Sequence, residues 1–414
     1  MLYNRTLQNK QNKILKKFLK YSSNLRKKKI INSPFLYPCT WYQNLSKVYL
    51  SRFLDQKNTM QIFINYIKEI LLILTILTYK IYKPSLKKKI YKDLVITWSK
   101  NNDIKKGIIS FDRFTKIKAN NNCIFFSVNL ESKFKVQKLK NTFFLTKTNF
   151  FSFNTLVNLM ILIKFLITIL LKKNIFYSLN IYSFYAYLFH HYFEQNLKNI
   201  NFKNVIMSYE GQPFQNLTIN KLKKKNKNIS VIGIVNSFQP FPLHLYKNDD
   251  APDKIKYGHK LIKNHMIKKL NWKNKDFIGK VNVDIDNFKG KILLPFSIRN
   301  YDKIYRTLYK LLNNKRIKGL NKLKIKVHPN TPELEEQLNL KYKLKRNLTS
   351  NNSTNEEKIL IAIGATSVIM SNLILGNTVY QIYENETLEC LSKSFWPDII
   401  SEKIDHNVIK YRLR

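Results

Sequence analysis

The chain places a carboxylate and a glycine directly after a strand-like segment, in the run Ser208-Tyr209-Glu210-Gly211. In open parallel sheets, ligands bind beyond the carboxyl ends of the strands. A glutamate at such an end can accept a proton from an incoming hydroxyl. A glutamate at the start of a helix can also satisfy free backbone N–H groups. Glu210 is therefore either a catalytic base or a structural carboxylate.

Polar and basic residues follow two other strand-like segments. His328 and Pro329 come after LKIKV, and an imidazole there can donate to a phosphate oxygen or protonate a leaving group. Ser297 and Arg299 follow KILLPF, where an arginine can clamp an anion. A lone histidine is also commonly a structural hydrogen-bonding residue, so both roles remain open for His328.

Small and hydroxyl-bearing residues follow a fourth such segment, in the run Gly364-Ala365-Thr366-Ser367. The backbone N–H groups of this turn, the two hydroxyls and the dipole of the following helix predict a phosphate site. A plain helix N-cap uses the same residue types.

Short apolar runs, most of them ending in polar residues or glycine, predict the strands that position these groups. They cover residues 93–99, 122–130, 204–208, 230–235, 290–297, 323–329, 358–364 and 377–383. Helical patterns at 301–314 and 365–375 alternate with them. This alternation predicts an α/β fold with parallel sheets and helices on both faces.

Two longer apolar stretches, at residues 62–82 and 156–171, resemble membrane spans. The first contains Lys68 and Glu69, and the second contains Asn158 and Lys164. Neither reaches about 18 uninterrupted apolar residues. We expect buried helices rather than membrane spans.

The composition indicates a folded, strongly basic protein. The 414 residues include 73 Lys and Arg against 26 Asp and Glu, a formal net charge of +47. This charge favours an anionic partner, either nucleic acid, a phosphorylated small molecule or a membrane surface. With 44% hydrophobic residues, disorder is excluded.

Cys39, Cys123 and Cys390 are odd in number and widely spaced. They exclude a disulfide framework and CxxC metal spacing, which favours a reducing compartment. The start of the chain is basic and amphipathic but lacks the apolar core and cleavage site of a secretory signal. This segment is either a helix lying on anionic lipid or a solvated extension.

Several motifs together resemble one enzyme family. They are YEGQPFQN, VIGIVNSFQPFPLHLY, APDKIKYGHK, the pair Asn271-Trp272, LPFSI, KVHPN and IGATSVIMSNLILGNTVY. This set resembles the bacterial surface-carbohydrate glycosyltransferases of GT-B fold, in particular the sialyltransferase-like enzymes of capsule and lipopolysaccharide synthesis. The resemblance covers about residues 200–400. It implies two Rossmann-like domains whose parallel sheets face each other across a cleft.

The resemblance also implies roles for the motif residues. Glu210 and Gly211 match the last two positions of an acidic-acidic-Gly motif that supplies the general base, although Tyr209 stands where the first acid is expected.

In the same way, His328 and Pro329 match an HP motif that supplies a histidine to the donor phosphate. Thr366 and Ser367 match a Ser/Thr motif that binds this phosphate.

The charge cluster at 221–228 marks the expected domain boundary. We expect a basic N-terminal extension (1–30), an acceptor-side α/β domain (31–222), a nucleotide-sugar-binding Rossmann-like domain (223–395) and a C-terminal segment (396–414). Asp284-Ile285-Asp286 is interpreted as a loop rather than a metal-binding DXD motif, so we expect no metal and no cofactor besides the nucleotide-sugar substrate.

The function expected from the resemblance is inverting, metal-independent sugar transfer from a nucleotide-activated donor to a lipopolysaccharide, O-antigen or capsule acceptor. The expected partners are this donor, a glycan or glycolipid acceptor and the anionic inner-membrane surface, with no specific nucleic acid. The enzyme would be cytoplasmic and peripheral on the inner face of the cell membrane. The alternatives are a glycerophosphate or polyol-phosphate transferase of the same superfamily, a catalytically inactive GT-B scaffold, or a basic RNA-binding protein. The sequence contains no RNP-like aromatic strand, GXXG clamp or zinc knuckle to support the RNA-binding alternative.

Overall fold

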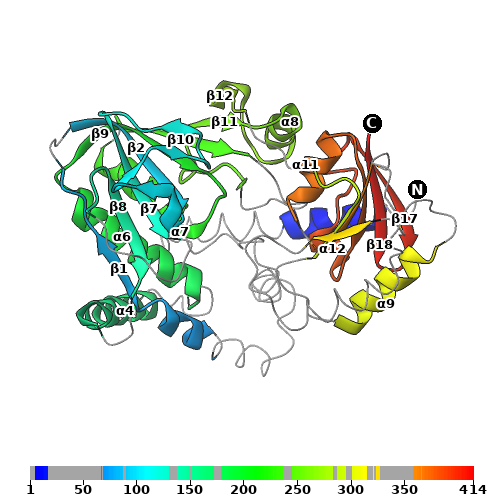
Figure 1. Ribbon diagram of the computed structural model, residues 1–414, viewed down its shortest axis with the longest axis horizontal. Helices are drawn as coiled ribbons and strands as arrows, with labels where there is room; N and C mark the ends of the chain where they lie inside the picture. The colour runs from blue at the N-terminus through cyan, green and yellow to red at the C-terminus, as the bar shows by residue number, and fades with distance from the viewer. Residues whose placement is uncertain are drawn as a thin grey trace. The chain divides into compact units, whose positions relative to one another are not determined.

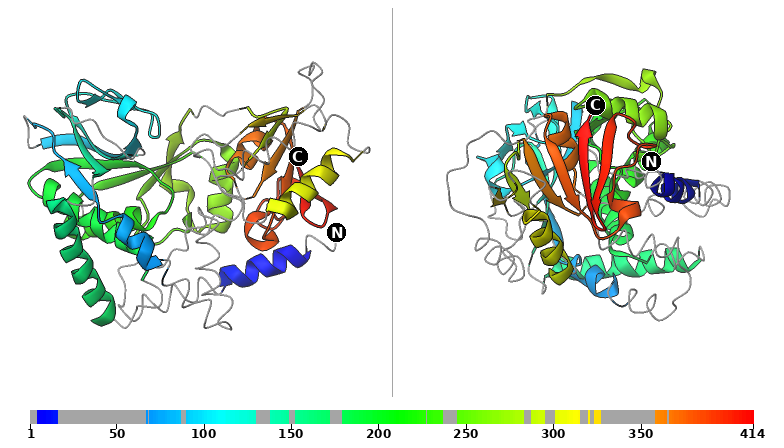
Figure 2. Two further views of the ribbon diagram at one scale, coloured as in Figure 1. Left: turned by 60° about the horizontal axis from the view of Figure 1, so that its bottom comes forward. Right: turned by 90° about the vertical axis from the view of Figure 1, so that its right-hand side faces the viewer.

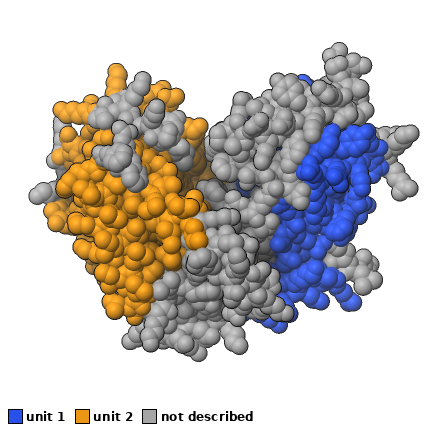
Figure 3. All heavy atoms as spheres, turned by 90° about the horizontal axis from the view of Figure 1, so that it is seen from below, with its two compact units in different colours: residues 1–16, 237–242, 283–414 blue, residues 17–236, 243–282 orange. Residues whose placement is uncertain are grey.

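The chain forms a mixed α/β structure with two compact units (Figure 3). We call residues 17–236 with 243–282 the N-terminal unit, and residues 1–16, 237–242 and 283–414 the C-terminal unit. The computed structural model describes residues 5–16, 67, 69–86, 90–129, 138–148, 152–171, 179–226, 228–236, 245–282, 287–294, 301–314, 320, 323–326, 358–364 and 366–414.

An eight-stranded sheet forms the centre of the N-terminal unit, in the order β1-β8-β7-β2-β9-β10-β11-β12 (Figure 1). All neighbouring strands are parallel except β1, which pairs antiparallel with β8. The strands are β1 (Tyr79–Tyr82), β2 (Ile90–Ser99), β7 (Cys123–Asn129), β8 (Thr142–Lys147), β9 (Asn201–Ser208), β10 (Ser230–Val235), β11 (Lys254–Tyr257) and β12 (Phe277–Lys280). The predicted strands at 93–99, 122–130, 204–208 and 230–235 are confirmed.

Helices and two small hairpins surround this sheet. The helices are α4 (Phe153–Leu171), α6 (Ile181–Leu197), α7 (Pro213–Lys225) and α8 (Lys260–Lys269), with 3-10 turns η1 (Asn101–Asp103) and η3 (Asn274–Asp276). Between β2 and β7, β3 (Ile104–Lys105) pairs with β4 (Ile108–Ile109), and β5 (Phe111–Asp112) pairs with β6 (Ile117–Lys118). All seven residues of β7 are buried, as is typical of a central parallel strand.

The C-terminal unit contains a six-stranded sheet in the order β14-β13-β15-β16-β18-β17. The first four strands are parallel, and the hairpin of β17 and β18 adds antiparallel to β16. Its elements are β13 (Lys291–Leu293), α9 (Tyr301–Leu312), β14 (Lys324–Lys326), β15 (Ile359–Ile363), α11 (Val368–Ile374), β16 (Thr378–Ile382), α12 (Glu386–Glu389), β17 (Ile399–Asp405) and β18 (Val408–Leu413). One side of the sheet packs against α9 through buried residues such as Ile292, Ile304, Leu308 and Ile361.

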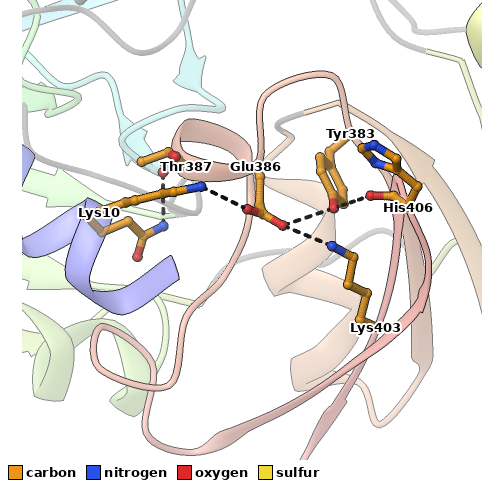
Figure 4. Close-up of polar contacts among 7 residues, drawn as sticks. Lys10, Tyr383, Glu386, Thr387, Lys403 and His406 are labelled. Atoms are coloured by element: carbon orange, nitrogen blue, oxygen red, sulfur yellow. Dashed lines mark hydrogen bonds and ion pairs between the residues drawn. The ribbon is translucent and has the colours of Figure 1, made fainter. Parts of the chain in front are cut away.

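The beginning of the chain is a helix over residues 5–16 that packs on the C-terminal unit. Its buried residues Leu7, Gln11 and Ile14 recur every three or four positions and so share one face. Gln11 Nε2 donates to the carbonyl oxygens of Thr387 and Cys390, at 3.0 and 2.9 Å, and Lys10 pairs with Glu386 (Figure 4). These residues of the expected extension are therefore part of the C-terminal unit, because the apolar face of their helix is buried against it.

The expected domain limits differ from the compact units. The lysines of the 221–228 cluster end α7 rather than form a linker, and β10 then pairs with β9 in the same sheet. Lysines in the last turn of a helix complement its dipole, which explains this cluster without a boundary. The change of unit falls near residue 283, and the expected C-terminal segment 396–414 belongs to the second sheet as β17 and β18.

The two long apolar stretches also differ from the expectation. Residues 69–75 are helical, but the chain then turns and enters strand β1. The second stretch is helix α4, as predicted, but one whole side of it is exposed. The expectation of buried helices is therefore wrong for the outer side of α4.

Candidate functional site

The strand order identifies where a ligand would bind to the N-terminal sheet. From β2 the chain continues to β7 and β8 on one side, and then returns to β9 on the other side of β2. In open α/β sheets, ligands bind at the carboxyl ends of the two strands where the order reverses. Here these ends are Ser99 of β2 and Ser208 of β9, so Glu210 lies two residues beyond the reversal point.

Side chains of α7 fix the backbone of the turn that carries Glu210. Gly211 has φ 64°, a left-handed conformation that favours glycine. The buried Gln215 donates from Nε2 to the Ser208 carbonyl at 2.6 Å. Its Oε1 accepts from the backbone N–H groups of Glu210 and Gln212, at 3.0 and 3.2 Å. The amide of one buried glutamine thus holds both sides of the turn.

The carboxylate of Glu210 has the properties of a general base that works near neutral pH. Gln212 Nε2 donates to Glu210 Oε2 at 2.7 Å and so orients the group. Burial raises the pKa of Glu210 from 4.5 to about 7, although the hydrogen bond from Gln212 opposes this rise. A base is most effective when its pKa lies close to the working pH. The backbone N–H groups of Glu210 and Gln212 donate to Gln215, so the Glu210 carboxylate is not needed to cap these two groups.

Tyr209 is a core residue. Its side chain is 1% exposed, and its hydroxyl donates to Asn216 Oδ1 at 3.0 Å. A methyl group placed on Gly233 of β10 would approach the Tyr209 Cβ to 2.9 Å, so the two strands fit closely here. The departure from the acidic-acidic-Gly pattern therefore places a packing residue, not a second acid, beside Glu210.

Aromatic side chains gather at the same end of the sheet. The ring of Trp98, at the end of β2, lies 5.6 Å from Phe114 and 6.0 Å from Phe214 of α7. Asn236, just after β10, donates to the Phe114 carbonyl at 2.9 Å and so ties this loop to the sheet. Half-buried Trp98 and Phe114 offer an apolar surface next to the reversal point.

The C-terminal sheet has its own reversal point, between β13 and β15. From β13 the chain goes to β14 on one side and returns to β15 on the other. The turn Gly364 to Ser367 leaves the end of β15, and Gly364 has φ 74°. Buried Gln381 donates to the Gly364 carbonyl at 2.9 Å. The expected phosphate turn is therefore placed where the strand order favours a ligand.

The two hydroxyls of this turn differ. Thr366 Oγ1 accepts from the Val368 N–H at 3.3 Å, which is the ordinary capping interaction. Ser367 is the N-cap of α11, but its side chain makes no capping hydrogen bond. Ser367 is half-buried, so it is the better candidate to contact a ligand.

Four of the expected site residues, Ser297, Arg299, His328 and Pro329, lie outside the described residues. The strands before them are described: β13 ends at Leu293 and β14 ends at Lys326, next to each other in the sheet. Their parallel ends share one edge with the end of β15. The sequence Asp284-Ile285-Asp286 is also outside the described residues.

The structure adds residues that the sequence reasoning missed. Gln212, Gln215 and Gln381 brace the two turns, and the pattern Gln212-Pro213-x-Gln215 is a capping-box signal that would have identified the first two. A hollow of about 420 Å³ also lies on the C-terminal unit. Its lining includes the basic side chains of Lys303, Arg306 and Lys310 of α9. The same lining includes the carboxylates of Asp302 and Asp405, so the hollow has mixed charge.

In the described part of the chain, no three His, Cys, Asp or Glu side chains are grouped to hold a metal ion. Metal-independent transfer stays a prediction. The thiols of Cys123 and Cys390 are free and buried, and burial raises the pKa of each. Neither a protein-family model nor a curated protein matches the chain.

Proposed function

We propose that the protein is a glycosyltransferase that moves a sugar from a nucleotide-activated donor to a surface-glycan acceptor, with its two units acting as the two domains of a GT-B fold. One observation carries the proposal: in each sheet the strand order reverses beside the turn that the motifs single out. Glu210 follows β9 at one reversal, and Gly364 to Ser367 follow β15 at the other.

In the proposed reaction, Glu210 removes the proton from the acceptor hydroxyl. The hydroxyl oxygen attacks the anomeric carbon of the donor, the bond to the nucleotide phosphate breaks, and the phosphate leaves with the electron pair. The configuration at the anomeric carbon is inverted. Ser367, Thr366 and His328 hold the leaving phosphate, and stabilising its charge contributes about 10²–10³-fold in rate for each such donor.

The local chemistry supports these assignments. A carboxylate with a pKa near 7 exchanges protons readily at neutral pH. Hydroxyl groups at the start of a helix suit an oxyanion, and the Ser367 side chain makes no capping hydrogen bond there. In this proposal the acceptor is a glycan or glycolipid, and the enzyme is peripheral on the inner face of the cell membrane.

The test is a thermal-shift screen with CMP, CDP, UDP and GDP. A ligand at about 100 times its dissociation constant stabilises the native state by about 2.7 kcal/mol. We expect one nucleotide to raise the melting temperature, and Ser367→Ala to reduce this rise while Ser371→Ala, in the same helix, leaves it unchanged. The absence of a shift with every nucleotide, together with binding of RNA, would favour the RNA-binding alternative.

A further inference from the structure

Helix α4 has apolar side chains on both of its long sides, but only one side is packed. Ile161, Phe165 and Ile169 are buried, and the Phe165 ring lies 5.5 Å from Phe184 of α6. Asn158, on the same side, donates to the carbonyl oxygens of Leu77 and Tyr79 at 2.6 and 2.7 Å. These contacts fix α4 on the N-terminal unit by its inner side.

The outer side of α4 is a continuous apolar stripe. Its side chains are between 41% and 79% exposed and recur every three or four residues: Phe153, Leu156, Leu159, Met160, Ile163, Ile167, Leu170 and Leu171. By length and composition, α4 could cross a membrane. An apolar surface of this extent marks a contact with a partner or a membrane.

The helical segment at 69–75 adds to this surface. It carries further exposed apolar side chains, at Ile70, Leu71, Leu72 and Leu74. The turn that follows it receives the hydrogen bond from Asn158 of α4, so the two segments adjoin (Figure 2). Two neighbouring elements of the N-terminal unit therefore each expose Leu and Ile side chains.

We propose that the outer side of α4 and residues 69–75 lie in the surface of a lipid bilayer with anionic headgroups. The helix lies along the surface and does not span the bilayer, because its inner side is packed on α6 and β1 and its Asn158 is bonded there. Helices that lie in this way bury one apolar face about 5–10 Å deep at the headgroup boundary.

The charges around this surface select lipid over a second copy of the chain. Lys164 is exposed beside the stripe, and Lys83 and Lys147 are exposed at β1 and its partner strand β8. Residues 69–86, 138–148 and 152–171 contain one acid, Glu69. Glu69 is buried and accepts from the Ile181 N–H at the start of α6. Pairing two copies would bring lysines together, whereas anionic headgroups neutralise them.

This inference deepens the membrane association that is part of the proposed function, but its test needs no sugar transfer. The membrane inference and the proposed sugar transfer can therefore be refuted independently of each other. It also assigns the contact to a different segment from the basic start of the chain, since the apolar side of the helix at 5–16 is buried on the C-terminal unit.

The test is flotation of the full chain with vesicles of phosphatidylcholine alone or with about one third phosphatidylglycerol. The variant Leu156→Gln/Ile163→Gln/Ile167→Gln changes three exposed side chains of the stripe. We expect it to lower the partition coefficient by about tenfold or more, and Lys164→Gln to lower it by about fivefold on anionic vesicles. The matched control, Ile278→Gln/Leu375→Gln/Ile400→Gln, changes three exposed aliphatic side chains elsewhere and should bind as the wild type does.

Hydrogen exchange of the wild type gives a second measurement that needs no variant. Anionic vesicles should slow exchange in the peptides covering residues 69–75 and 153–171. Equal vesicle binding by the stripe variant and the wild type would overturn the proposal. It would also be overturned if the wild type bound neither kind of vesicle, or if it formed a dimer that the stripe variant abolished.

Discussion

The turn after β9 and the turn after β15 have the same construction but carry different chemistry. Each follows a parallel strand at a reversal of strand order, each uses a glycine with positive φ, and in each a buried glutamine donates to a backbone carbonyl. The glutamines are Gln215, 2.6 Å from the Ser208 oxygen, and Gln381, 2.9 Å from the Gly364 oxygen. The two units thus support the turns at their strand ends in a similar way.

The side chains that these turns present are different. The first presents a carboxylate, Glu210, whose pKa burial raises to about 7. The second presents the hydroxyls of Thr366 and Ser367 at the start of α11. A carboxylate repels a phosphate, whereas hydroxyl and N–H donors attract it. In the proposed reaction, the two similar turns would therefore serve different steps: the first would remove a proton, and the second would bind the leaving group.

The largest expected effect is that of Glu210→Gln on turnover. The amide cannot accept the acceptor proton, so the turnover number should fall by about 10²-fold or more. Steady-state kinetics with sugar conjugates of the nucleotide that the screen identifies measure this. Glu194→Gln, on an exposed site of the same unit, is the control. A normal rate, or a loss that follows unfolding alone, would make Glu210 structural.

Removing either supporting glutamine should destabilise the fold to a similar degree. Gln215→Ala and Gln381→Ala each leave buried backbone groups unpaired, which costs about 1–3 kcal/mol. Urea denaturation measures the change, and exposed Gln195→Ala should stay within about 0.5 kcal/mol of the wild type. If only one of the two substitutions lowers the free energy of unfolding, the two glutamines do not support their turns equally.

A smaller effect is expected from Trp98→Ala. If the aromatic surface beside β2 receives the acceptor, the KM for the acceptor should rise by about tenfold, in line with about 1.5 kcal/mol for an aromatic contact. The KM for the donor should stay the same. Initial rates at varied acceptor and donor concentrations give the two KM values separately. A rise in the KM for the donor would contradict binding of the acceptor at this surface.

The pH dependence of stability and turnover has a defined sign. The pKa of Glu210 is about 7 in the folded chain against 4.5 for the free group, so the native state binds more protons between these values. Stability from this group therefore falls as pH rises through that window. Turnover should rise with pH as Glu210 ionises, and Glu210→Gln should gain stability relative to the wild type between pH 5 and 8. Parallel melting curves at each pH measure this difference.

The sequence predicted the strands well because their β-branched and aromatic runs are local signals. The end of β9 and the turn after β15 were placed correctly for this reason. The domain limit expected near residue 222 does not coincide with the change of compact unit near residue 283. The pairing of β9 with β10 is a non-local contact, and the lysines there end helix α7.

Two features, one in the candidate site and one outside it, depended on tertiary structure. The position of Glu210 beside β2 follows from the strand order, which no local pattern contains. The exposed side of α4 was also not predictable, because a helix that is apolar on all sides does not indicate which side is packed. The bracing role of Gln215, in contrast, was open to prediction from the capping pattern.

The division of labour between the two turns is tested most directly by nucleotide binding to Glu210→Gln and Ser367→Ala, measured by calorimetric titration at one pH. The account predicts that Glu210→Gln binds the nucleotide as tightly as the wild type, because its carboxylate acts on the acceptor. It predicts that Ser367→Ala binds about tenfold more weakly, since a hydrogen bond to a charged group contributes about 1.5 kcal/mol. Tight binding by Ser367→Ala together with weak binding by Glu210→Gln would contradict it.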